Sequence, residues 1–338
     1  MRLLRYILRR LLFVVPVILG AIFISFFLTR IVPGNPIDII AGPYASDERV
    51  AEMKEEAGLN DPFYVQFWTY LMDLLRGDFG VSYNTTGQPI AQDLRERLPA
   101  SAELVTYGML LAIALALPLG IVSAVRRGTW IDHVGRVIAV LGVSVPIFWI
   151  ALVLLSIFYA NLGWLPGAQG RLPIGMQAPE RITGFYTIDA LVQGQWRTAW
   201  EAARSLTLPV VTIGLVAMAP IARMTRATMI EALESDYVRT SRSLGLPRRV
   251  IVLHHAFKNA LLPVLTLIAA VFGFAIGGEV LVAYIFSWPG LGLYSYNAIF
   301  RSDFPAIQGF IIVATLIYVL IYLVVDVVTA TLDPRVEF

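Results

Sequence analysis

The sequence contains no cysteine, which excludes disulfide bonds, thiolate metal sites and cysteine nucleophiles. Lysine is almost as scarce: Lys54 and Lys258 are the only lysines among 26 basic residues, and neither follows a glycine. The phosphate-binding pattern G-x-x-x-x-G-K-[ST] is therefore absent, so the chain cannot itself be a P-loop ATPase. Charge as a whole is also scarce, because 15% of the residues are charged where an average soluble domain has about a quarter.

Apolar residues make up 57% of the 338 residues, and this excess indicates a membrane protein. The net charge of +2 and a pI near 8.8 could suggest a nucleic-acid partner. Basic residues that cluster between apolar stretches are better explained by membrane topology. We therefore expect contacts with membrane lipid and no nucleic-acid partner.

Apolar stretches long enough to cross a membrane recur along the chain. A helix needs about 20 predominantly apolar residues to cross roughly 30 Å of hydrocarbon, since each residue rises about 1.5 Å. Six stretches qualify: residues 11–29, 104–125, 137–162, 205–222, 259–285 and 304–325. The predicted fold class is all-α, a polytopic membrane protein with six transmembrane helices.

The distribution of arginine predicts the orientation in the membrane, because cytoplasmic loops carry an excess of Lys and Arg. The excess lies at the N-terminus, in residues 126–136 and 223–258, and in the tail after Asp326. Both termini should therefore be cytoplasmic. The long acidic segment 30–103 should lie outside the cell.

The outer segment contains a helical pattern from Pro62 to Leu75, where aromatic and aliphatic residues recur at helical spacing. We therefore expect an ordered subdomain. The chain divides into residues 1–103, the first transmembrane helix plus this acidic extracytoplasmic subdomain, and residues 104–338. The second part is a five-helix core with a cytoplasmic loop at 223–258.

The cytoplasmic loop has the layout of a helix, a stop and a second helix. Ser235 or Asp236 can cap a short helix, Gly245 supplies a left-handed stop, and Pro247 suits the start of the next helix. One face can be shared by four residues: Ile230, Leu233, Tyr237 and Leu244. Such a loop could bind a partner protein, or it could be an amphipathic helix lying on anionic lipid.

Short motifs favour the first alternative. Arg239, Thr240 and Ser241, followed after three residues by Gly245, occupy the places of the E-A-A-x-x-x-G loop of ABC importer permeases. The chain resembles the dipeptide, oligopeptide and nickel branch of these permeases. Further matches to this branch are IVPGNP at 31–36, LNDP at 59–62, GDFG at 77–80, FSWPGLG at 286–292 and DPRV at 333–336.

The resemblance implies a type I ABC importer permease fold in a prokaryotic inner membrane. It also implies a pore-forming subunit that imports peptides or related small solutes by alternating access. The partners it implies are a homologous second permease, two cytoplasmic ATPase subunits that hold ATP and Mg²⁺, and an extracellular or periplasmic binding protein. No cofactor or metal is expected in this chain, and no catalytic residue. The residues expected to couple to the ATPase are Asp236, Arg239, Thr240, Ser241, Arg242, Leu244 and Gly245.

Two rival functions remain open at this point. A gradient-driven secondary transporter would need ionisable residues buried in its spans, and within the six stretches only Glu279 is available. A membrane scaffold without transport would leave the cytoplasmic loop without a purpose. Peptide, nickel chelate and sugar-derived solutes all remain possible cargo of an importer.

We assign no function to three further patterns. His254 and His255 are adjacent, so on a helix they point about 100° apart and cannot hold one metal together. The glycosylation pattern at Asn84 is taken as incidental. Gly273 and Gly277 form a G-x-x-x-G step that we interpret as a helix-packing site.

Glu279 departs from the family pattern. Relatives typically carry a glutamate at the place that Ala283 holds here, one helical turn later. Glu279 should lie near the outer membrane boundary, either as a helix-end acid exposed to water or paired with Arg301. The alternative hypothesis is that it lines the outer mouth of the pore.

Overall fold

The computed structural model of the protein describes residues 2–31 and 60–332, with positions 46, 48, 51, 52 and 55 between them. Most of the IVPGNP motif, Leu59 of LNDP and the DPRV motif lie outside the described residues. Within the described part the only β-structure is an isolated bridge between Val81 and Pro89. The all-α prediction is confirmed.

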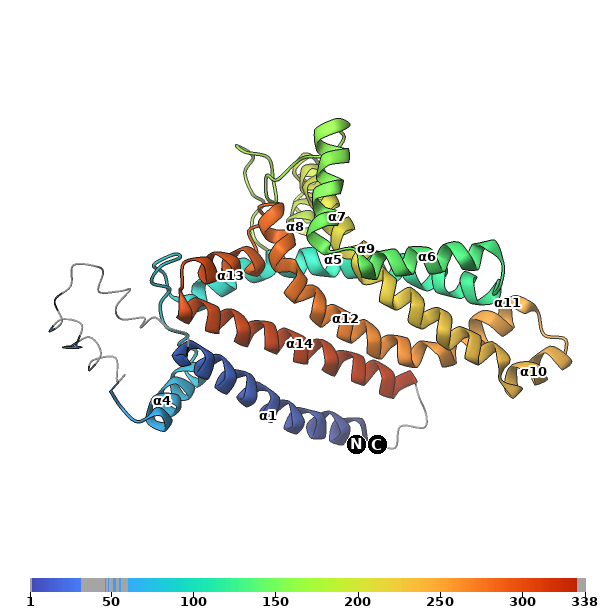
Figure 1. The fold of residues 1–338 in the computed structure, drawn as a ribbon, viewed down its shortest axis with the longest axis horizontal. Coiled ribbons are helices and arrows are strands. Elements are labelled where there is room, and N and C mark those ends of the chain that lie inside the picture. Colours follow the sequence, from blue (N-terminus) through green and yellow to red (C-terminus); the bar gives the residue numbers. More distant parts are fainter. Residues whose placement is uncertain are drawn as a thin grey trace. The chain divides into compact units, whose positions relative to one another are not determined.

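The described helices follow one another along the chain (Figure 1). In order they are α1 (Arg2–Ile31), α4 (Phe63–Leu75), α5 (Ile90–Val125), α6 (Trp130–Ser144), α7 (Ile147–Leu154), the π-helix η1 (Leu155–Asn161), α8 (Tyr186–Val192), α9 (Trp196–Glu234), α10 (Asp236–Ser243), α11 (Arg248–Val250), the π-helix η2 (Ile251–Ala256), α12 (Phe257–Ile285), α13 (Leu291–Phe300) and α14 (Phe304–Leu332).

Five of the described helical segments are long and apolar enough to cross a membrane. They are Arg10–Leu28, Ile90–Val125, Trp196–Glu234, Arg248–Ile285 and Phe304–Thr331. These segments correspond to the first, second, fourth, fifth and sixth predicted spans. Several run well beyond the apolar stretch, since the 39 residues of α9 cover about 58 Å where the hydrocarbon is about 30 Å thick.

The third predicted span corresponds to a broken pair of helices, and it brings the number of candidate spans among the described residues to six if the pair is counted as one span. Its two halves, Trp130–Ser144 and Ile147–Asn161, are bent by 105° at a short break. Val145 and Pro146 at the break have extended backbone, with ψ of 127° and 140°. Proline cannot donate the next helical hydrogen bond and disfavours helix at the residue before it, which is why α6 ends there.

The chain forms two compact units, residues 1–98 with 293–319 and residues 99–292 with 320–338. The division drawn from the sequence differs in that it left residues 293–319 with the core. In the first unit the predicted helix at 62–75 is present as α4, and α4 packs against α1 through aromatic rings. The ring of Phe26 lies 5.3 Å from Phe63 and 5.5 Å from Phe67, measured between centroids.

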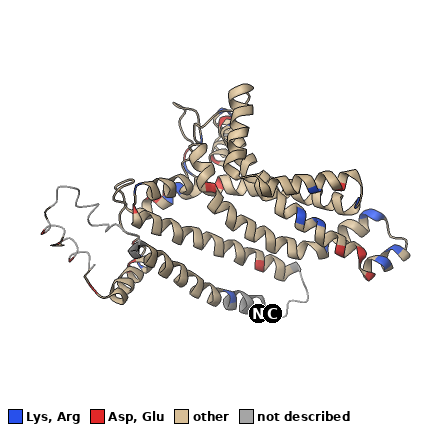
Figure 2. Ribbon diagram, viewed as in Figure 1, with Lys and Arg blue, Asp and Glu red and all other residues tan. Residues whose placement is uncertain are grey.

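The second unit is built around α9 and α12, which lie side by side (Figure 1). Small residues let other helices approach α9 closely. A Cβ added to Gly142 of α6 would lie 2.6 Å from the Cβ of Ala219, and one added to Gly120 of α5 would lie 2.8 Å from the carbonyl oxygen of Ala222. The middle of α9 and α12 is uncharged, whereas charged residues gather over α10, α11 and the end of α9 (Figure 2).

Candidate functional site

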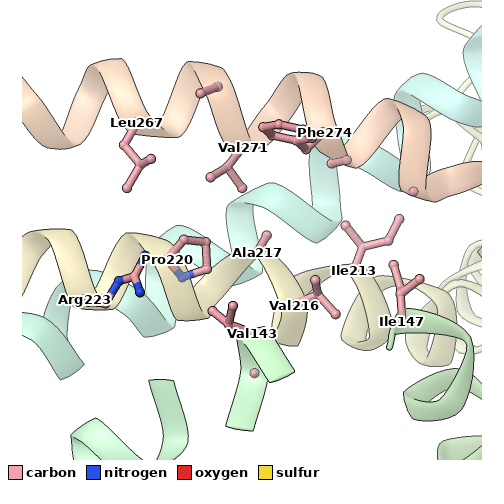
Figure 3. Close-up of a pocket in the computed structure, with 14 residues that line it drawn as sticks. Val143, Ile147, Ile213, Val216, Ala217, Pro220, Arg223, Leu267, Val271 and Phe274 are labelled. Atoms are coloured by element: carbon pink, nitrogen blue, oxygen red, sulfur yellow. The ribbon is translucent and has the colours of Figure 1, made fainter. Parts of the chain in front are cut away.

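A cavity of about 440 Å³ lies in the second unit, bounded by α9, α12 and the bend between α6 and α7 (Figure 3). Val143 comes from the end of α6 and Ile147 from the start of α7, so the bend at Pro146 places both helices at the cavity. Its α12 side carries Phe274, whose side chain is 82% exposed. The cavity is of the size that holds small molecules, for which about 300 to 1,000 Å³ is typical.

The lining of the cavity is apolar except at one residue. Glycine, alanine, proline and larger aliphatic or aromatic residues make up the rest, and Arg223 of α9 is the single charged side chain. Figure 3 shows Arg223 beside Pro220, across from Leu267 of α12. The cavity can therefore accept an apolar solute surface together with one anionic group.

A second arginine lies one helical turn further along α9 and is neutralised. Arg226 forms a bidentate pair with the buried Asp132 of α6, at 2.6 Å from Nε and 2.9 Å from a terminal nitrogen. Asp132 also accepts a hydrogen bond from the backbone N–H of Gly128 at 3.1 Å. This pair ties the start of α6 to α9.

Glu279 does not lie where the sequence suggested. Its side chain is 1% exposed, and its carboxyl group accepts a hydrogen bond from the hydroxyl of Ser101 in α5. The same hydroxyl accepts a hydrogen bond from the backbone N–H of Leu291 at 2.7 Å, so Glu279 helps hold the turn before α13. Arg301 instead donates to the backbone carbonyl of Asn84 at 3.0 Å.

The expectation that Glu279 is a helix-end acid exposed to water was therefore wrong. Its hydrogen-bond partner Ser101 is 178 positions away in the sequence and could not be connected with it by local pattern. Ala283, one helical turn later on α12, is buried as well. Glu279 is not among the residues that line the cavity, although its neighbour Gly278 is.

The residues expected to couple to an ATPase lie on and just after α10. Asp236 begins the helix, and its exposed carboxylate pairs with Arg239 at 3.4 Å. Thr240 and Ser241 donate hydroxyl hydrogen bonds back to the carbonyls of Asp236 and Tyr237 within the helix. Ser235 does not cap α10 with its side chain, because its hydroxyl donates to the carbonyl of Ala232 instead.

The predicted stop at Gly245 is confirmed, since its φ is +71°. The backbone N–H of Gly245 donates to Arg242 and that of Leu246 donates to Ser241, which closes the end of α10. A Cβ at Gly245 would meet nothing within 4 Å. The glycine is thus required by the left-handed backbone and not by close packing.

The predicted shared face was only partly right. Ile230 and Leu233 pack against a cluster of buried residues on the inner side of the loop. The residue that α10 contributes to this cluster is Val238. Tyr237 and Leu244 point outward, and Leu244 is 74% exposed. Alternation along the short helix α10 separates Tyr237 from Val238, so the loop has an inner face and an exposed outer one.

A connection between the third and fourth spans holds charged groups that sequence reasoning missed. Arg171, which is 8% exposed, donates to the carboxylate of Glu103 at 2.5 Å and to the carbonyl of Gly184 at 2.6 Å. Its guanidinium lies 3.4 Å from the ring centroid of Tyr186. Glu103 also accepts hydrogen bonds from the backbone and hydroxyl of Thr187 at 3.0 and 2.7 Å.

Asp189 completes this connection. It accepts hydrogen bonds from the backbone N–H groups of Ile182, Thr183 and Gly184 at 3.2, 2.8 and 2.8 Å. Burial alone raises the pKa of Asp189, but these hydrogen bonds and one from the Thr183 hydroxyl outweigh it. The pKa therefore lies below its ordinary value of 3.8.

The structure places the histidine pair and one glycine of the G-x-x-x-G step. The rings of His254 and His255 are 6.3 Å apart and nearly perpendicular. The described residues contain no group of His, Cys, Asp and Glu that could hold a metal. A Cβ added to Gly277 would meet nothing within 4 Å among the described residues, so its packing role stays a prediction.

The chain matches one family of known proteins over nearly its whole length. Residues 116–338 match the family of binding-protein-dependent transport system inner membrane components, and residues 3–105 match the N-terminal region of such components. The two matches cover nearly the whole chain. The chain belongs to this family of type I ABC importer permeases and is a multi-pass membrane protein.

Full-length relatives are transport permeases. The chain is 41% identical to the dipeptide transport system permease protein DppB of Alkalihalophilus pseudofirmus, over 99% of this chain and all of the relative. It is also 41% identical to the probable D,D-dipeptide transport system permease protein DdpB of Escherichia coli, over 95% and 94% of the two chains. The glutathione transport system permease protein GsiC of Salmonella choleraesuis is 33% identical over 99% of both chains.

Proposed function

We propose that this chain is the pore-forming permease subunit of an ABC importer for dipeptides or similarly small peptides. The observation that carries the proposal is the full-length identity of 41% to a dipeptide permease. The apolar cavity of about 440 Å³ at the bend between α6 and α7 supports it, because a small peptide could pass along such a surface.

Transport is driven by separate ATPase subunits. ATP binding closes the ATPase pair, and this rigid-body motion swings the permease between inward-facing and outward-facing states. The loop around α10 and Gly245 receives the motion. Its outer face, with Tyr237 and Leu244 exposed and Asp236 and Arg239 in water, is suited to seat in a groove of a partner protein.

The complete importer contains further subunits. A homologous second permease completes the pore, two cytoplasmic ATPase subunits hold ATP and Mg²⁺, and a binding protein delivers the peptide from outside. Both termini and α10 lie in the cytoplasm, as the arginine distribution favours. This chain needs no cofactor of its own.

Reconstitution tests this function. Proteoliposomes that hold the chain with its second permease and ATPase subunits, supplied with the binding protein and ATP, should accumulate radiolabelled alanyl-alanine. Uptake should stop when ATP is replaced by a non-hydrolysable analogue. Uptake that continues without ATP when a proton gradient is imposed would identify a secondary transporter instead, and ATPase subunits that never copurify with the chain would contradict the proposal.

A further inference from the structure

The single charge in the cavity suggests how the transported molecule is held. We propose that Arg223 binds the C-terminal carboxylate of the peptide as it passes through the cavity between α9, α12 and the bend at Pro146. This inference rests on the proposed function, because it assigns the substrate's carboxylate to a residue of the transport route.

The setting of Arg223 supports this role. Every other lining residue is glycine, proline, an aliphatic residue or Phe274, so no acid in the lining can neutralise the guanidinium. Arg223 forms no ion pair with any residue that the structure describes. Charges in membrane-crossing helices are costly and usually serve function when they face a cavity.

Arg226 provides an internal comparison. It is on the same helix, three residues later, and its charge is used within the chain by the bidentate pair with Asp132. Arg223 is exposed and has no such partner among the residues that the structure describes. It lines the cavity, so its five donors are available to an incoming group.

The chemistry of peptides matches this arrangement. A guanidinium presents a planar fork that fits both oxygens of a carboxylate. Every unmodified peptide has a C-terminal carboxylate, whereas its side chains vary. A site that recognises the shared group with one arginine, and covers the rest with apolar walls, accepts many peptides without distinguishing their side chains.

The position of Arg223 also gives the peptide a direction. Arg223 and Leu267 lie at one end of the cavity, and Ile147 and Ile213 lie at the other (Figure 3). With the proposed orientation, the end at Arg223 is the cytoplasmic one, since α9 continues from it to the coupling loop. The peptide should therefore travel with its carboxylate toward the cytoplasm.

Photolabelling of the assembled complex tests the inference without the binding protein, which has its own selectivity. The probes are a dipeptide of alanine and a diazirine-bearing leucine analogue, and the C-terminal amide of the same dipeptide. The wild-type complex should be labelled on α9 or α12 at least tenfold more by the acid than by the amide. Arg223→Gln should abolish this preference, while Arg223→Lys should retain part of it.

Arg197→Gln is the matched control, because Arg197 is exposed on the same helix and does not line the cavity. It should label like wild type. ATPase activity and subunit assembly should be normal in all variants, which separates a binding defect from a folding defect. If the Arg223→Gln complex does not assemble, Arg223→Lys takes its place in the comparison. The lysine variant should still be labelled more by the acid than by the amide, but by a smaller factor than the wild type.

The outcomes separate the inference from the function beneath it. A wild-type importer that takes up no alanyl-alanine contradicts the proposed function. An importer that takes it up, but labels equally with acid and amide or is not labelled in the cavity at all, overturns the role of Arg223 alone. Equal labelling of wild type and Arg223→Gln by the acid would also overturn it.

Discussion

Two connections in the second unit, residues 162–195 and 235–256, use their charged residues in opposite ways. In the first, Arg171 and Asp189 are buried: Arg171 pairs with Glu103 of α5, and Asp189 accepts backbone hydrogen bonds from within the connection. In the second, Arg239 and Asp236 are mostly exposed and pair only with each other at 3.4 Å. In the first connection the polar groups stabilise the chain's own structure, whereas in the second they stay exposed and can bind a partner.

This difference indicates that residues 162–195 stabilise the fold and that residues 235–256 form a contact surface. Buried ion pairs are costly to break because the remaining charge is left without a partner. Exposed pairs contribute little to stability. Substitutions in residues 162–195 should therefore affect folding, whereas substitutions in α10 should affect assembly and transport.

The largest effect is expected from Glu103→Ala, which leaves the guanidinium of Arg171 buried without its carboxylate. Loss of one partner of a buried pair costs about 3 to 5 kcal/mol. The detergent-solubilised protein should lose most of its thermal stability. Glu201→Ala is the control, because Glu201 pairs with Arg204 at 3.5 Å in a more exposed setting. Equal losses in the two variants would remove the distinction between the connections.

The next largest effect is expected from Gly245→Val. A β-branched residue is strongly disfavoured at a φ of +71°, at a cost of about 1 to 2 kcal/mol. The protein should insert normally, but ATP-driven uptake should fall about tenfold relative to ATP hydrolysis. Gly245→Asn should keep most of the activity, because asparagine tolerates this backbone conformation. Normal coupling in the valine variant would show that the stop after α10 does not matter for transport.

A smaller effect is expected from Asp189→Asn. The folded-state pKa of Asp189 lies below its ordinary value of 3.8, which also applies in the unfolded chain. The ionised group therefore contributes stability above pH 3.8, and this contribution is lost as the pH falls through the folded pKa. Below pH 4, protease resistance of residues 162–195 should fall in the wild type. The asparagine variant should be weaker at neutral pH and should show less pH dependence, and an identical pH profile would contradict this role.

The smallest effect on stability is expected from Arg239→Ala. Its partner Asp236 is exposed, so the melting temperature should be unchanged. Copurification of the ATPase subunits should nevertheless weaken, because α10 presents this arginine to the partner. A lowered melting temperature with normal ATPase binding would reverse the roles that we assign to the two connections.

Much of the fold follows from local sequence signals. Apolar length predicted the spans, and the glycine at 245 predicted the end of α10, because both depend on residues close in the chain. The bend of 105° at Pro146 was not predicted. Proline indicates a break, but the angle is set by how α6 and α7 pack on α9 and α12.

The site itself required the structure. The cavity combines residues from three separated segments, and Arg223 differs from Arg226 only because Asp132 lies beside one of them. Glu279 likewise finds its hydrogen-bond partner in the distant Ser101. Pattern within a helix cannot reveal such partners, since it carries no information about which helices become neighbours.

Crosslinking in the assembled importer tests most directly whether the α10 loop is the surface that receives the ATPase. The chain has no cysteine, so single cysteines can be introduced at Leu244 and at Ile174, which are 74% and 99% exposed. Each is modified with a maleimide-linked photocrosslinker. The account predicts that the cysteine at 244 crosslinks to an ATPase subunit and that the one at 174 does not. Crosslinking of the ATPase from 174, or from neither position, would contradict it.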